Sequence, residues 1–65
     1  GTDAYVTSVK TLYSELLPDY QYLLKSVTEI KEAADAENNY LVSAKMDEFI
    51  ASYAKTIWML NQALL

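Results

Sequence analysis

Two pairs of carboxylates come closest to a spacing that could support chemistry. Glu29 and Glu32 lie three residues apart, so a helix would place them on one face. Asp47 and Glu48 are adjacent and would point in different directions. A carboxylate pair can divide acid and base roles only where its surroundings push the two pKa values apart. Both pairs have polar neighbours in the sequence, so we interpret them as solvated surface.

The five residues 35–39 (Asp-Ala-Glu-Asn-Asn) begin like a calcium-binding loop. Such a loop needs glycine at its sixth position for a sharp turn and glutamate at its twelfth as a bidentate ligand. Here these positions hold Tyr40 and Met46. The sequence therefore predicts no calcium site.

The residue types that most enzymes use are missing. The chain has no histidine and no cysteine, which removes the usual general base, the thiol nucleophile, disulfides and common zinc sites. A serine or threonine nucleophile would lack a base, and Gly1 is the only glycine, so a phosphate-binding loop is excluded. We expect no catalytic residue, no cofactor and no metal, and we predict that the protein is not an enzyme.

The net charge of −4 and the pI of about 4.4 disfavour partners that are themselves anionic. A phosphate backbone or an anionic membrane would repel such a surface. The most hydrophobic stretch, residues 49–65, is interrupted by Lys55, Asn61 and Gln62. We therefore expect a soluble protein, with a cytoplasmic location favoured and with neither a nucleic-acid nor a membrane partner. Because the sequence starts with Gly1 and not with Met, we also expect a processed or trimmed start.

Apolar residues repeat at heptad spacing along the first half of the chain and again, in another phase, along the second half. Steps of three and four residues are typical of one buried face of an α-helix. The pattern predicts an all-α protein with two helical stripes. The first stripe is Val6, Val9, Tyr13, Leu16, Tyr20, Leu23, Val27, Ile30 and Ala34, and the second is Met46, Ile50, Tyr53, Ile57, Leu60 and Leu64.

The phase of the pattern is lost at Asn38-Asn39. Asparagine suits both the left-handed position after a helix and the N-cap of the next helix. We therefore expect a tight turn there, which makes the chain an antiparallel helical hairpin. The last helix should run over about residues 40–64.

Pro18 interrupts the first stripe without shifting its phase. With Val6 at heptad position a, Pro18 falls at position f, on the side away from the buried seam. This favours helices over about residues 3–17 and 18–36 that are roughly collinear, with a bend at the proline. Asp3, or alternatively Thr2, would be the N-cap of the first helix. In the alternative, Pro18 opens a new helix after a chain reversal, which would give a monomeric three-helix bundle.

A single domain of 65 residues is marginal in size, and without disulfides or metals a second copy is the obvious supplement. Some apolar and aromatic residues could contact such a partner, and a two-helix hairpin would leave Trp58, Met59 and Leu65 wet. We expect a homo-oligomer, with a dimer favoured, in which two hairpins form a four-helix-type bundle. The candidate interface residues are Tyr5, Leu12, Tyr53, Trp58, Met59 and Leu65.

These features predict a non-enzymatic module for protein–protein interaction or oligomerisation. An alternative is a small acidic inhibitor or chaperone-like adaptor that caps a basic or hydrophobic partner protein. A third hypothesis, a carrier of an apolar ligand, rests only on the width of the apolar stripes.

Overall fold

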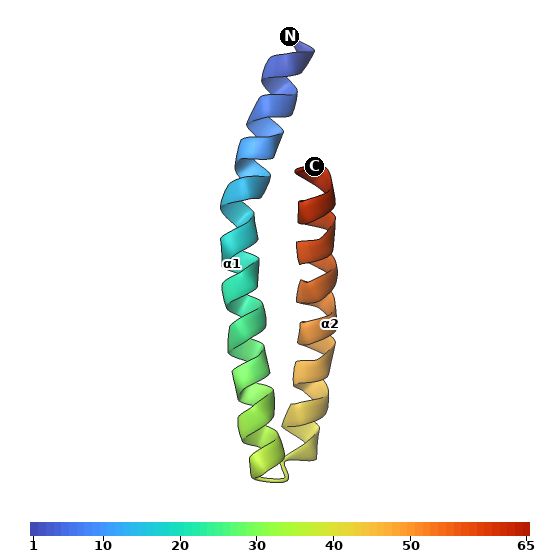
Figure 1. The fold of residues 1–65 in the computed structure, drawn as a ribbon. Coiled ribbons are helices and arrows are strands. Elements are labelled where there is room, and N and C mark those ends of the chain that lie inside the picture. The colour runs from blue at the N-terminus through green and yellow to red at the C-terminus, as the bar shows by residue number, and fades with distance from the viewer.

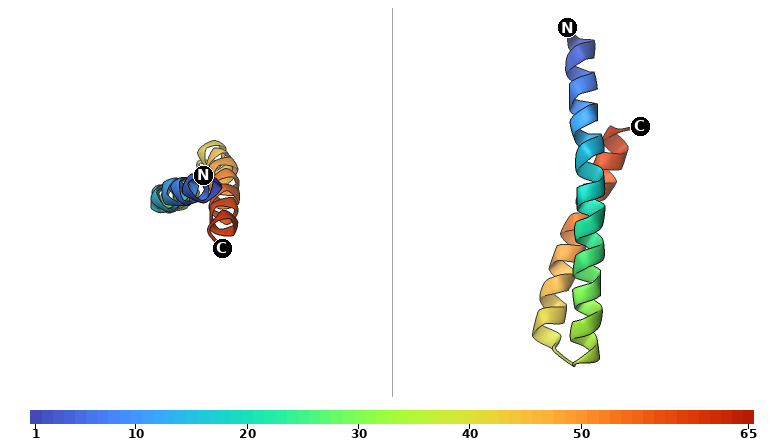
Figure 2. Two further views of the ribbon diagram at one scale, coloured as in Figure 1. Left: turned by 90° about the horizontal axis from the view of Figure 1, so that it is seen from above. Right: turned by 90° about the vertical axis from the view of Figure 1, so that its left-hand side faces the viewer.

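The computed structural model describes all 65 residues as two long α-helices joined by a short turn. Helix α1 spans Thr2–Ala36 and helix α2 spans Tyr40–Ala63. They run antiparallel, side by side, in a rod of 54 × 14 × 14 Å (Figure 1). The two further views show that the helices cross one another (Figure 2). The predicted all-α hairpin is confirmed, and neither helix has the length and apolar character needed to cross a membrane.

Helix α1 passes through Pro18 without ending. Proline cannot donate a backbone hydrogen bond to the carbonyl of Ser14, but both residues are exposed, so water can reach that carbonyl. The segments 3–17 and 18–36 are therefore one helix, and the alternative of a chain reversal with three helices in one chain is wrong. The N-cap of α1 is Gly1, so Asp3 lies in the first turn instead of at the cap.

The turn at Asn38-Asn39 is confirmed, with each asparagine in a different role. Asn38 adopts φ 58°, the left-handed conformation. The N–H groups of Asn39 and Asn38 donate to the carbonyls of Ala34 (2.8 Å) and Asp35 (3.1 Å), which is the Schellman pattern at a helix C-terminus. The side chain of Asn39 accepts from the N–H of Val42 at 3.2 Å and so caps α2.

The seam between the helices uses the whole second stripe but only part of the first. Leu60 is buried and the other five residues of the second stripe are half-buried. On α1, Leu23 and Ile30 are 38% and 47% exposed, while their neighbours Leu24 and Lys31 are half-buried in their place. An α-helix has 3.6 residues per turn, so its contact line drifts by about 20° per heptad toward later residues. This drift moves the seam from position d to position e along α1.

The first residues of α1 extend past the end of α2 (Figure 1). Helix α1 has 35 residues and α2 has 24, a difference of 11 residues or about 16 Å of helix. Val6, which the heptad pattern places in the seam, is exposed because it lies in this overhang. Tyr5 is exposed there as well.

Candidate interaction surface

A cluster of four polar side chains, Lys31, Asp35, Ser43 and Asp47, joins the two helices near the turn. Lys31 Nζ lies 2.9 Å from Asp47 Oδ1 and donates to Ser43 Oγ at 2.8 Å. The Ser43 hydroxyl in turn donates to Asp35, whose other oxygen is 3.7 Å from Lys31 Nζ. Ser43 is buried, and these bonds satisfy it. The polar cluster therefore fixes the pairing of the helices at this end. Separately, no three acidic side chains are grouped closely enough to hold a metal ion.

The surroundings of Lys31 favour its charged form. The hydrogen bond with Asp47 raises the pKa of Lys31 above its ordinary value of 10.5, and the charges of Asp35 and Asp47 raise it further. Partial removal from water acts in the opposite direction and is outweighed. Lys31 is therefore protonated at neutral pH and acts as a cationic bridge between the helices.

Aromatic side chains occupy the middle of the seam. Tyr20 of α1 meets Tyr53 of α2 edge to face, with ring centroids 6.0 Å apart. Phe49 stacks against Tyr53 with ring centroids 6.0 Å apart, and Lys45 Nζ lies 5.6 Å from the centre of the Phe49 ring. Such contacts are favourable ring arrangements. Tyr53 therefore already has partners within the hairpin.

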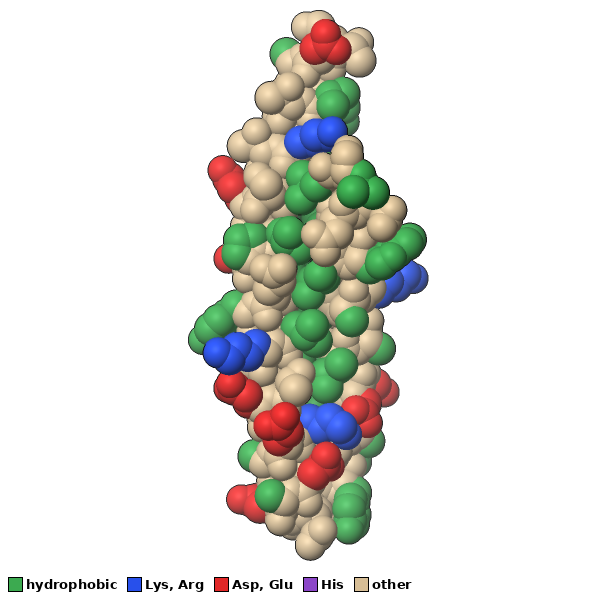
Figure 3. Space-filling view, viewed as in Figure 1, with side chains coloured by type: hydrophobic (Ala, Val, Ile, Leu, Met, Phe, Trp, Pro, Cys, Tyr) green, Lys and Arg blue, Asp and Glu red, His purple; other side chains and the backbone are tan.

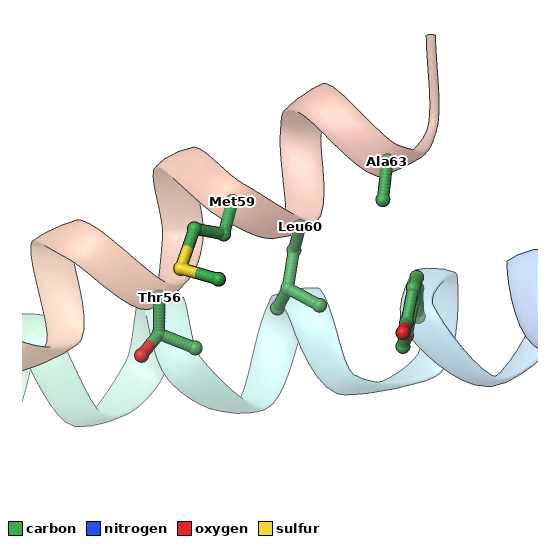
Figure 4. Close-up of a pocket in the computed structure, with 5 residues that line it drawn as sticks. Thr56, Met59, Leu60 and Ala63 are labelled. Atoms are coloured by element: carbon green, nitrogen blue, oxygen red, sulfur yellow. The ribbon is translucent and has the colours of Figure 1, made fainter.

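A half-open apolar pocket of about 250 Å³ lies where α2 approaches its C-terminal end. Tyr13 lines it from α1, and Thr56, Met59, Leu60 and Ala63 line it from α2 (Figure 4). The small side chains of Thr56 and Ala63 leave the space that larger residues would fill. The pocket is therefore a place where packing within one chain is incomplete.

The remaining surface has two flanks that differ in chemistry. In an antiparallel pair of helices, the g positions of both lie on one side of the seam and the e positions on the other. We call the e side the polar flank. On this side Lys31 contacts Asp47, and Lys10 Nζ donates a hydrogen bond to the Leu65 carbonyl at 3.3 Å. The g side, which we call the apolar flank, carries exposed large side chains at position g (Tyr5, Leu12 and Phe49) and at the neighbouring positions d and c (Leu23, Ile30 and Met59).

The structure divides the candidate interface residues predicted from the sequence. Tyr5, Leu12 and Met59 are exposed on the apolar flank, whereas Trp58 and Leu65 are exposed at position b, beside the polar flank. The expectation that a hairpin leaves Trp58, Met59 and Leu65 wet is confirmed. Tyr53 is half-buried in the seam, so the six residues do not form one continuous surface.

Two features of the surface were missed in the sequence. Ser43 lies seven residues before Ile50, so a second stripe extended backwards by one heptad includes it. A polar residue in the seam predicts a polar partner on α1. Lys31 lies between Glu29 and Glu32, a pair that we interpreted as solvated surface, and it is that partner. The pocket had a weaker signal, since Thr56 and Ala63 are small residues one heptad apart beside the stripe.

Sequence relatives are short, partial matches. The chain is 40% identical over 53 residues to a UPF0182 protein of Clostridium tetani and 32% identical over 54 residues to one of Clostridium botulinum. These matches cover 82% and 83% of this chain but 6% of each relative. It is also 33% identical over 55 residues to a DNA protection during starvation protein of Helicobacter pylori, covering 85% of this chain and 38% of that protein. No family model and no solved structure matches.

Proposed function

We propose that this chain is a non-enzymatic oligomerisation module whose hairpin packs against a second copy of itself to form a four-helix bundle. The observation that carries this proposal is the small amount of surface that the hairpin buries alone. Four of 65 residues are buried, and no side chain is fully buried. A second hairpin is the simplest partner that supplies the missing contacts.

The exposed area supports a partner of this size. The hairpin exposes 4881 Å², whereas a compact monomer of 7.4 kDa would expose about 4,200 Å². The excess is close to the roughly 800 Å² that each partner contributes to a standard interface. Large exposed apolar patches of this kind mark interaction sites in soluble proteins.

The apolar flank is the surface that we propose for the contact. Its apolar side chains follow α1 from Tyr5 to Ile30, and Phe49 and Met59 continue it onto α2. The open pocket beside Met59 could receive a side chain of the partner. The polar flank offers Trp58 and Leu65, but its charged groups would have to leave water.

The oligomeric state of the wild type and of two matched variants tests this proposal. Leu12 on the apolar flank is 52% exposed and Trp58 is 62% exposed, so replacing either by glutamine should leave the hairpin helical. We expect the wild type to sediment as a dimer at micromolar concentration. A two-fold interface contains each residue twice, so Leu12→Gln should weaken the dimer about tenfold or more.

Trp58→Gln should leave the dimer nearly unchanged, and circular dichroism of each variant shows whether the helices are retained. A folded wild-type monomer would contradict the proposal as a whole. A dimer that is weakened by Trp58→Gln and not by Leu12→Gln would keep the oligomer but move the contact to the other side of the hairpin.

The relatives do not supply a function for this chain, because it spans a minor part of each of them. The name of the Helicobacter pylori protein refers to DNA. The net charge of −4 on this chain is opposite to the charge that a phosphate backbone attracts. A DNA-binding role is therefore not part of the proposal.

An acidic adaptor that caps a basic partner protein is the second candidate function. Its support is a group of glutamates near the turn, Glu29, Glu32 and Glu37, that have no lysine partner in the hairpin. Binding through these groups would weaken as salt is added. An affinity for a captured protein that did not change with salt would contradict this candidate.

A further inference from the structure

The charges of the hairpin are distributed unevenly along its length. We call residues 26–51 the turn end and the remaining residues, 1–25 and 52–65, the open end. The turn end has six acidic and two basic residues, a net charge of −4, and the open end has three of each, a net charge of zero. The acidic residues of the turn end are Glu29, Glu32, Asp35, Glu37, Asp47 and Glu48. Figure 3 shows acidic side chains gathered toward this end of the rod.

The two lysines of the turn end are already paired inside the hairpin. Lys31 contacts Asp35 and Asp47, and Lys45 lies 3.0 Å from Glu48. Each therefore already offsets acidic groups of its own copy. The lysines of the open end, Lys10, Lys25 and Lys55, have no carboxylate partner in the hairpin.

We propose, on the basis of the proposed self-association, that the second copy lies antiparallel to the first, with each acidic turn end beside the partner's neutral open end. A parallel arrangement would place two ends of charge −4 side by side. Packed helices are about 8–10 Å apart, and the Debye length at physiological salt is about 8 Å, so this repulsion is only partly screened. The antiparallel arrangement avoids it.

Apolar contact sets the extent of the overlap. Exposed apolar side chains follow the apolar flank of α1 from Tyr5 near one end to Ile30 near the other. Two copies that met only through their overhangs would share about 16 Å of helix and would leave Leu23 and Ile30 wet. Side-by-side overlap along the whole of α1 covers the flank in both copies. The two-fold axis then passes near the middle of α1, close to Asp19, an exposed residue at position g whose charge the two copies would bring together there.

Pulsed electron–electron resonance between spin labels tests this arrangement directly. The chain has no cysteine, so one introduced cysteine gives one label per copy. Ala36 lies at the turn end and Gln21 near the middle of α1, both are exposed and uncharged, and neither belongs to the apolar flank. The variants Ala36→Cys and Gln21→Cys therefore keep the charge distribution and the proposed contact intact.

The antiparallel dimer predicts different distances at the two sites. The Ala36 labels should be about 50 Å apart, because each lies 17 residues from the axis at about 1.5 Å per residue. The Gln21 labels should be about 10–25 Å apart, mainly across the width of the bundle. Sedimentation and circular dichroism of both labelled variants should match the wild type.

Other outcomes separate this inference from the function on which it rests. Short distances at both sites would show a parallel dimer, which overturns the antiparallel arrangement and keeps self-association. An Ala36 distance beyond about 80 Å would show contact through the overhangs alone and would also overturn it. An absence of any dipolar coupling in a folded sample would overturn both the arrangement and the proposed oligomer.

Discussion

The turn end and the open end of this hairpin are stabilised by different physical effects. At the turn end, a Schellman motif, a side-chain N-cap and the polar cluster around Lys31 define which residues of α1 meet which residues of α2. At the open end, the seam consists of apolar and aromatic packing beside a pocket of about 250 Å³. One end therefore has directional contacts and the other has contacts that tolerate rearrangement.

This difference separates pairing from association. Directional hydrogen bonds fix the register of the two helices, so the turn end decides how the hairpin closes. The open end keeps apolar surface that the chain does not use, including the overhang of α1 and the surroundings of Met59. A partner that covers this surface would add stability without changing how the hairpin is paired.

The largest predicted effect is the loss of Leu60, the buried leucine at the open end. Leu60 is 7% exposed and lines the pocket, so Leu60→Ala would remove contacts and enlarge a space that is already incompletely filled. We expect the free energy of unfolding to fall by about 2–4 kcal/mol. Urea denaturation followed by circular dichroism measures this change.

Leu41→Ala is the matched control at the turn end, because Leu41 is 84% exposed. It should change the free energy of unfolding by about 0.5 kcal/mol or less. Equal effects of the two substitutions would show that the open end does not depend on packing in the hairpin and would remove the contrast between the two ends.

An intermediate effect is predicted for Asn38, which is the one non-glycine residue with a positive φ, at 58°. Asn38→Ala should cost about 1 kcal/mol, because alanine lacks the short polar side chain that lets asparagine tolerate the left-handed conformation. Asn38→Gly should be neutral or slightly stabilising, because glycine adopts this conformation without the steric penalty. Thermal unfolding of the two variants measures the difference. If alanine and glycine were equivalent, the turn would not depend on this conformation.

The helical hairpin could be predicted from the sequence because its signals are local. Heptad spacing indicates helices, and an asparagine pair at the point of lost phase indicates a turn. The local sequence around Pro18 does not decide the structure there, because it allows either a bend in one helix or the start of a new helix. The preserved phase on both sides of Pro18 correctly favoured a helix that continues through the proline.

The polar cluster and the pocket depend on contacts between distant residues, so the stripes alone do not specify them. The prediction that Leu23 and Ile30 lie in the seam is wrong because a strict heptad ignores the drift of a helix with 3.6 residues per turn. That same drift brings Lys31 against Ser43. The candidate interface residues fall on two flanks because of the side on which α2 packs against α1. That side cannot be predicted from the sequence of α1 alone.

The smallest predicted effect concerns the polar cluster and appears only at alkaline pH. The pKa of Lys31 is raised in the folded state, first by its hydrogen bond with Asp47 and then by the nearby carboxylate charges. A raised pKa means that folding favours the protonated form. The stabilisation is therefore complete below the ordinary lysine pKa of 10.5 and is lost as the pH rises through the higher folded value.

Thermal unfolding of the wild type and of Lys31→Met between pH 7 and about pH 11 measures this loss, because all the other ionisable groups are common to the two proteins. The melting temperature of the wild type should exceed that of Lys31→Met by a constant amount up to about pH 10, and the gap should narrow above it. Lys55→Met removes a lysine that has no carboxylate partner in the hairpin, so its gap to the wild type controls for the loss of one charge. If the two gaps had the same pH dependence, the contacts of Lys31 with Asp35 and Asp47 would not contribute to closing the turn end, and the register would depend on the capped turn alone.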